Sequence, residues 1–119
     1  MRLLNRDSGA VIAERIDEAR TFWRRFRGLI GTELLPEGSG LHIRPCRSVH
    51  TWFMKYAIDV VHLDAYGQVI GVEKQLLPGS MGTAFRGTVS VVELPAGTIE
   101  RTGTKVGQAI QFQEEEDYK

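Results

Sequence analysis

Residues 58–64, Ile-Asp-Val-Val-His-Leu-Asp, place the strongest constraint on the fold of this chain. The segment is typical of a β-strand, because β-branched residues dominate it and a turn-forming stretch follows it. Alternation along a strand puts Ile58 and Val60 on one face, and Val61 and Leu63 on the other. A strand that is apolar on both faces is covered on both, so we expect it at the centre of a buried sheet.

Turn residues between further apolar runs predict a mainly β fold. Residues 58–73 are expected to form a hairpin around a turn at 64–67, and residues 3–13 a second hairpin around 5–9. Further short strands are predicted at residues 41–44, 88–94 and 109–112. We therefore expect a small β-sandwich or partly open barrel with one amphipathic helix packed on it.

That helix is predicted over residues 18–27, with Asp17 as its N-cap and Gly28 just after its end. Its apolar residues are spaced three or four apart, as on one face of a helix: Ala19, Phe22, Trp23 and Phe26. A neighbouring face carries the arginines Arg20, Arg24 and Arg27. One further helical turn is expected at residues 98–102, ending at Gly103.

The length of 119 residues predicts one domain, and the 42% hydrophobic content suffices for a core without staples. No apolar run approaches the roughly 20 residues that a membrane-spanning helix needs. Arg2, Arg6 and Asp7 interrupt any signal-peptide pattern, so we expect a soluble, cytoplasmic, bacterial protein without a membrane partner.

The charges are balanced overall but unevenly distributed. The chain has 15 basic and 15 acidic residues, and residues 114–119 hold four of the acids and one lysine, so the rest has 14 basic and 11 acidic residues. We expect residues 1–113 to form the domain and 114–119 a disordered acidic tail. The small positive excess argues against a nucleic-acid partner.

Residues 45–55 contain the densest group of reactive side chains. Cys46 and His50 suggest a thiolate–imidazole pair, but no oxyanion-stabilising motif accompanies them, and a lone cysteine is more often a small buried hydrophobe. His42, Cys46 and His50 would align as metal ligands on a helix, yet Pro45 and the strand pattern before it argue against one. We predict no metal and no cofactor.

Taken in order, a set of short motifs resembles the family called domain of unknown function 192 (DUF 192), which comprises uncharacterised bacterial and archaeal proteins. The matching pieces are Arg27-Gly28-Leu29, Pro45-Cys46, Ser48, His50-Thr51, Met54-Lys55, Ile58-Asp59-Val60-Val61, Leu63-Asp64, Val69, Val91-Val92-Glu93-Leu94, Ala96-Gly97 and Val106-Gly107. The resemblance covers about residues 2–112. It implies a compact, mainly β fold with a helix on one side, and it implies no assigned activity.

Two histidines depart from this family pattern. His62 stands where the family usually has phenylalanine, and His42 where it usually has an apolar residue. Neither is therefore expected in a metal or catalytic site shared by the family. The polar residues that match the pattern include Asp64, whose place at the start of a tight turn gives it a structural explanation.

The remaining polar residues form our predicted ligand-binding set: His50, Thr51, Lys55, Asp59 and Glu93. Polar groups near a concave apolar surface are typical of a binding site, whereas the alternative is a polar network that fixes loops. Asp59 and Glu93 both fall on apolar strands, where a carboxylate needs hydrogen bonds or a cation.

Three hypotheses for the function follow. The favoured one is a non-enzymatic module that binds a small molecule, glycan or peptide in a cleft near His50. The second is a hydrolase-type enzyme in which His50 acts as general base and Asp59 or Glu93 orients it. The third is an interaction domain that binds an acidic partner or RNA through Arg20, Arg24 and Arg27. The sequence names no catalytic residue and leaves the oligomeric state open.

Overall fold

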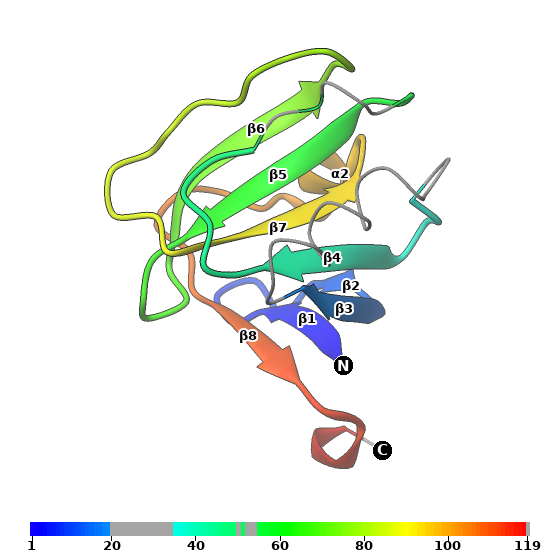
Figure 1. Ribbon diagram of the computed structural model, residues 1–119. Helices are drawn as coiled ribbons and strands as arrows, with labels where there is room; N and C mark the ends of the chain where they lie inside the picture. Colours follow the sequence, from blue (N-terminus) through cyan, green and yellow to red (C-terminus); the bar gives the residue numbers. More distant parts are fainter. Residues whose placement is uncertain (20–34, 50, 52–54, 119) are drawn as a thin grey trace.

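The computed structural model describes residues 1–19, 35–49, 51 and 55–118. Within them, eight strands form two sheets, one with the order β2-β1-β8 and one with the order β3-β4-β7-β5-β6 (Figure 1). The strands are β1 (Arg2–Asn5), β2 (Val11–Ala13), β3 (Arg15–Ala19), β4 (Ser39–Ile43), β5 (Ile58–Leu63), β6 (Val69–Leu76), β7 (Ser90–Pro95) and β8 (Ile110–Gln113). The fold is mainly β, as predicted, and the described strands do not close into a barrel.

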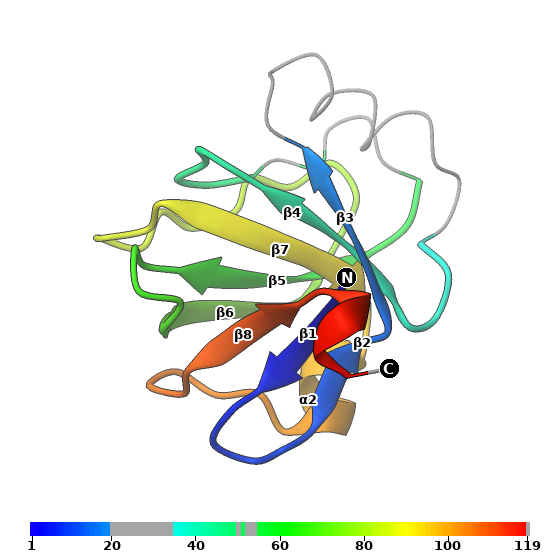
Figure 2. The same ribbon diagram turned by 90° about the horizontal axis from the view of Figure 1, so that it is seen from below.

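Strands β5 and β7 of the five-stranded sheet are buried on both faces. Every residue of β5 and β7 is buried, and β5 lies between β7 and β6, which confirms the central position predicted for residues 58–63. The sheet's inner face, with Val61 and Leu94, packs against Leu3 and other residues of the three-stranded sheet (Figure 2). Its outer face carries a second apolar cluster around Val60 and Val91.

Both predicted hairpins are present. Strands β1 and β2 pair antiparallel around the turn after Asn5, and β5 pairs antiparallel with β6. The turn between β5 and β6 depends on Asp64, whose Oδ1 accepts hydrogen bonds from the backbone N–H groups of Tyr66 and Gln68, both at 2.9 Å. This confirms the structural explanation of Asp64.

The helix predicted over residues 18–27 is wrong at its start. Asp17, the predicted N-cap, and the first two residues of the helix belong to β3, which pairs parallel with β4 from Arg15 to Ala19. The spacing of apolar side chains could not reveal this pairing, because β3 gains its backbone partners from residues that lie far along the chain. The remainder of the predicted helix, with Arg20, Arg24 and Arg27, lies outside the described residues.

The predicted helical turn at residues 98–102 is confirmed as α2 (Thr98–Thr102), the α-helix of the described residues. Glycines flank it at both ends, Gly97 with φ +94° and Gly103 with φ +66°, values that side-chain-bearing residues rarely adopt. Neither this helix nor any other described one is long and apolar enough to cross a membrane. After β8, Glu115–Asp117 forms a short 3₁₀ helix.

Candidate functional site

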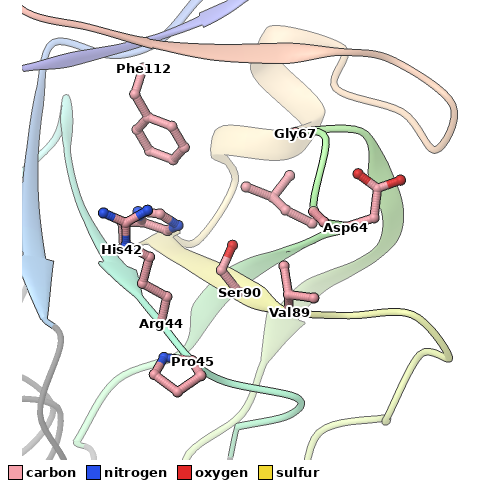
Figure 3. Close-up of a pocket in the computed structure, with 10 residues that line it drawn as sticks. His42, Arg44, Pro45, Asp64, Gly67, Val89, Ser90 and Phe112 are labelled. Carbon is pink, nitrogen blue, oxygen red and sulfur yellow. The ribbon is translucent and has the colours of Figure 1, made fainter.

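A pocket of about 580 Å³ opens between the two sheets, at the ends of β4 and β5 and the start of β7 (Figure 3). Phe112 of β8 covers it on the side of the three-stranded sheet. The lining residues, which define the inter-sheet pocket, are His42, Arg44, Pro45, Leu63, Asp64, Ala65, Gly67, Val89, Ser90 and Phe112. The volume lies within the roughly 300–1,000 Å³ that is typical of sites for small molecules.

An aromatic pair closes one end of the inter-sheet pocket. The rings of His42 and Phe112 stack with centroids 4.3 Å apart and planes 25° from parallel. Both carboxylate oxygens of Glu18 lie 3.1 Å from Nδ1 of His42, and because a carboxylate only accepts, the Nδ1–H group of His42 donates the hydrogen bond to Glu18. The pairing of β3 with β4 places Glu18 beside His42, so the unexpected strand fixes the orientation of this imidazole.

Three further polar side chains line the pocket: Arg44, Ser90 and Asp64, the acceptor of the turn after β5. Arg44 is about half exposed (47%), and its Nε lies 3.7 Å from Glu18, too far for a hydrogen bond. Ser90 is buried, and its hydroxyl points toward the interior of the pocket in Figure 3. The pocket thus combines apolar walls with a cation, a carboxylate and a hydroxyl group.

Asp59, one of the predicted site residues, is fully engaged in holding the backbone. Its Oδ2 accepts hydrogen bonds from the N–H groups of Gly97 (3.1 Å) and Ile99 (2.8 Å) at the start of α2. Its Oδ1 accepts one from the N–H of Gln75 (2.8 Å), which has a left-handed φ of +53° at an irregularity of β6. Asp59 therefore joins a helix start and a strand distortion to the central strand.

Glu93 is buried in a quite different way. Its carboxyl group lies on the outer face of the sheet, 1% of the residue is exposed, and Oε1 has no hydrogen-bond partner among the described residues. Burial raises the pKa of Glu93 from 4.5 to about 8, because the charged form is poorly solvated there. At neutral pH Glu93 is therefore mainly a neutral carboxylic acid that can donate a hydrogen bond.

The other three predicted site residues are only partly described. Thr51 is fully buried, and its Oγ1 donates to the carbonyl of Leu77 (2.6 Å) and accepts from the N–H of Ser80 (2.8 Å), which ties it to the loop after β6. Lys55 is exposed, and His50 lies outside the described residues. The structure does not bring Asp59 and Glu93 together, because they project from opposite faces of the sheet. The binding set stays a prediction.

The outer face of the sheet holds a buried histidine–carboxylate pair that the sequence pattern does not predict. Nε2 of His62 lies 2.7 Å from Oε1 of Glu73, and Oε2 of Glu73 accepts a hydrogen bond from the N–H of Thr83 (2.8 Å). The ring of Phe85 covers His62, with the centroids of the two rings 4.6 Å apart. The hairpin register, which places Glu73 opposite Val60, was the signal that could have revealed this pair.

No sequence signal connected the residues of the inter-sheet pocket, since His42 on β4 and Phe112 on β8 lie far apart in the sequence. Among the described residues, no three histidine, cysteine, aspartate or glutamate side chains are grouped so that they could hold a metal ion. The absence of a metal from the protein stays a prediction.

Comparison with known proteins identifies the family. The family DUF192, described as "Uncharacterized ACR, COG1430", matches residues 3–112, nearly the whole domain. The chain belongs to DUF192. The resemblance inferred from the motifs is therefore confirmed, and the family has no established function.

Two archaeal members of the uncharacterised family UPF0127 resemble this DUF192 protein in sequence. One, from Thermococcus sibiricus, is 31% identical over 123 residues, covering 97% of this chain and 77% of the relative. The other, from Pyrococcus furiosus, is 31% identical over 117 residues, covering 92% and 97%. These archaeal relatives do not support the expectation of a bacterial source.

Two solved structures share the fold of this DUF192 protein. A protein of unknown function from Novosphingobium aromaticivorans has a TM-score of 0.77 at 19% identity, covering 93% of this chain and 82% of that one. A protein from Sinorhizobium meliloti has a TM-score of 0.75 at 19% identity, covering 92% and 89%. At this level of identity the likeness concerns the fold alone.

Proposed function

We propose that this domain is a non-enzymatic binding module, and that it holds its ligand, or one group of a larger ligand, in the inter-sheet pocket. The observation that carries this proposal is the combination of a 580 Å³ pocket, the aromatic wall of Phe112 and the polar groups of Arg44 and Ser90. Apolar walls with a few well-placed polar groups are typical of sites that bind small molecules.

The cleft predicted near His50 remains a separate proposal for the same function. Its support is Glu93, which offers a neutral carboxyl group on the outer face of the sheet. The hydrolase hypothesis draws on the same observation, since a carboxylic acid with a raised pKa is suited to general acid catalysis. Asp59 gives that hypothesis no support, because three backbone N–H groups already occupy its carboxylate.

The proposal is tested with indole as a small aromatic probe, followed by ¹⁵N–¹H correlation spectra of the whole protein. We expect saturable shifts at the amides of Gly67, Ser90 and Phe112. Val89, which lines the pocket and is 43% exposed, is replaced in Val89→Trp, which should abolish these shifts by filling the pocket mouth.

Val106→Trp is the matched control, because Val106 is similarly exposed (59%) and does not line the pocket. This variant should bind indole as the natural protein does. Shifts that persist in Val89→Trp, or that appear only away from the pocket, would overturn the proposal.

A further inference from the structure

The outer edge of β8 borders the inter-sheet pocket. On one side β8 pairs with β1, with Leu3 opposite Phe112. On the other side, the N–H of Ile110 donates to the carbonyl of Gly67 at 3.0 Å, so the backbone of Ile110 points away from β1. Because backbone direction alternates along a strand, the N–H and C=O of Phe112 point the same way as those of Ile110.

Beyond Ile110, this edge of β8 pairs with no strand in the part of the chain that the structure describes. This edge of β8 begins beside Gly67, which accepts from Ile110, and continues to Phe112, whose ring stacks on His42. Gly67 and His42 both line the pocket. Figure 3 shows β8 crossing directly above the pocket, with the Phe112 ring hanging into it. A row of backbone hydrogen-bonding groups and a side-chain pocket therefore lie next to each other.

The sequence of β8 does little to protect this edge. Proteins commonly guard exposed edges with lysine, proline or a bulge, whereas β8 reads Ile-Gln-Phe-Gln and is guarded only by its shortness. An unguarded edge beside a pocket is the arrangement by which domains add an extended peptide as one more strand: backbone bonds give affinity and the pocket gives specificity.

The charges beside the pocket indicate what such a peptide carries. Arg44 is half exposed at the pocket wall. Asp64, the acidic residue of the lining, accepts two backbone N–H groups of its own turn at Oδ1. Arg44 forms an ion pair with Glu18 through Nε at 3.7 Å, longer than a hydrogen bond, and its side chain stays 47% exposed, so the guanidinium can also meet the carboxylate of a partner. The complementary group is a carboxylate two positions from the side chain that enters the pocket, because those positions share a face in an extended peptide.

We infer that the partner of this domain is an extended peptide segment that pairs with the outer edge of β8 at Phe112, places an apolar side chain in the inter-sheet pocket and directs an acidic side chain to Arg44. This inference rests on the proposed function, since it uses the same pocket and names the class of ligand.

The test uses two fluorescently labelled, amidated hexapeptides, Thr-Val-Phe-Thr-Glu-Val and its reverse, Val-Glu-Thr-Phe-Val-Thr, so that both strand directions are covered. Binding is measured by anisotropy against the whole protein. The better peptide is then compared with versions that are N-methylated at alternate residues, in each of the two possible phases. N-methylation removes the backbone N–H groups and leaves the side chains, so one phase should weaken binding about tenfold, the effect of losing roughly 1.4 kcal/mol.

Variants of the protein locate the contact. Arg44→Gln and Val89→Trp should each weaken binding several-fold. Arg101→Gln and Val106→Trp are the controls, since Arg101 is similarly exposed (56%) and neither residue lines the pocket. Bound peptide should also slow hydrogen exchange of the Phe112 amide.

Equal binding of both N-methylated peptides, or unchanged exchange at Phe112, would overturn the inference. If indole binds in the pocket and no peptide does, the inference fails while the proposed function stands; if neither binds, both fail. A concentration-dependent dimer in sedimentation experiments, with the Phe112 amide protected in it, would show that a second copy occupies the edge and would also overturn the inference.

Discussion

Asp59 and Glu93 lie one residue out of register on the paired strands β5 and β7, and their carboxyl groups project from opposite faces of the same sheet. Asp59 faces inward and accepts hydrogen bonds from three backbone N–H groups, whereas Oε1 of Glu93 faces outward and has no hydrogen-bond partner in the part of the chain that the structure describes. Two buried acids, each flanked by apolar residues in the sequence, therefore differ in how their charge is stabilised. Backbone hydrogen bonds stabilise the carboxylate of Asp59, whereas burial disfavours the charged form of Glu93.

Replacing Asp59 should destabilise the fold strongly. Asp59→Ala leaves three backbone N–H groups without their acceptor, two of them at the start of α2, and we expect a loss of about 3 kcal/mol in the free energy of unfolding. Asp64→Ala is the comparison: it also loses two backbone hydrogen bonds, but water reaches that exposed turn, so about 1 kcal/mol is expected. Urea denaturation measures both values, and equal losses would contradict the assignment.

The raised pKa of Glu93 makes stability depend on pH. Between the unfolded value of 4.5 and the folded value of about 8, the folded protein retains a proton that the unfolded chain has released. Stability from this group is therefore complete below pH 4.5 and falls as pH rises toward 8, by up to about 1.4 kcal/mol per pH unit.

Glu93→Gln is the matched variant for this prediction, because it keeps the shape and removes the ionisation. Its unfolding free energy should fall less than that of the natural protein between pH 5 and 8, as measured by denaturant titration at each pH. Parallel profiles for the two proteins would show that Glu93 is not protonated at neutral pH.

Glu93 should also influence Tyr56. Burial and, secondly, the negative charge of Glu93 raise the pKa of the Tyr56 phenol above its usual value of 10.0. Since Glu93 is ionised at the alkaline pH at which tyrosine titrates, Glu93→Gln should lower the pKa of Tyr56. Ultraviolet titration of the tyrosinate band measures the pKa, and Tyr56→Phe assigns the signal to Tyr56. An unchanged pKa of Tyr56 in Glu93→Gln would contradict an electrostatic effect of Glu93 on the phenol.

Gly71 is required by the ring that covers His62. A Cβ atom at Gly71 would approach the Phe85 ring to 2.4 Å, closer than van der Waals contact allows. Gly71→Ala should therefore cost about 1–3 kcal/mol by displacing that ring. In Gly71→Ala combined with Phe85→Ala the clash is gone, so the two losses should sum to more than the loss of the double variant. If the losses of the two single variants simply add up in the double variant, the cost of Gly71→Ala does not come from a clash with the Phe85 ring.

Removing residues 114–119 should change stability little. Glu114–Asp117 is exposed, and the segment contacts the domain where the guanidinium carbon of Arg2 lies 3.9 Å from the centroid of the Tyr118 ring. Such an exposed pair contributes about 0.5–1 kcal/mol, so we expect the melting temperature to fall by less than about 4 °C. A larger fall, not reproduced by Tyr118→Ala, would show that the acidic residues themselves are docked.

Local pattern was enough to predict most of the strands. The segment 58–63 carries apolar residues on both faces, and the structure places it at the centre of the larger sheet. The hairpins around 5–9 and 64–67 followed from turn residues whose partners are close in the chain. β3 was mistaken for a helix because its partner β4 is distant, so that no local signal distinguished a short parallel strand from a helix start.

The candidate site was less accessible to sequence analysis because its geometry depends on register. Nothing in the sequence relates the face of Asp59 to that of Glu93 until the pairing of β5 with β7 is known. The same holds for His42, whose contact with Phe112 arises only when β8 crosses the end of the larger sheet. Sequence patterns indicated that Asp59 and Glu93 are buried, but not which polar side chains meet.

The pairing of β1 with β8 has a consequence for how the protein is made. Arg2 and Gln113 lie 111 positions apart and are joined by a side-chain hydrogen bond of 2.8 Å within that strand pair. A ribosome must therefore release the chain as far as β8 before β1 meets its second neighbour, and closing so large a loop slows folding. Until then, Leu3 and the inner face of β1 lack part of their cover, so the hairpin of β1 and β2 exposes apolar surface while the residues up to β8 are synthesised.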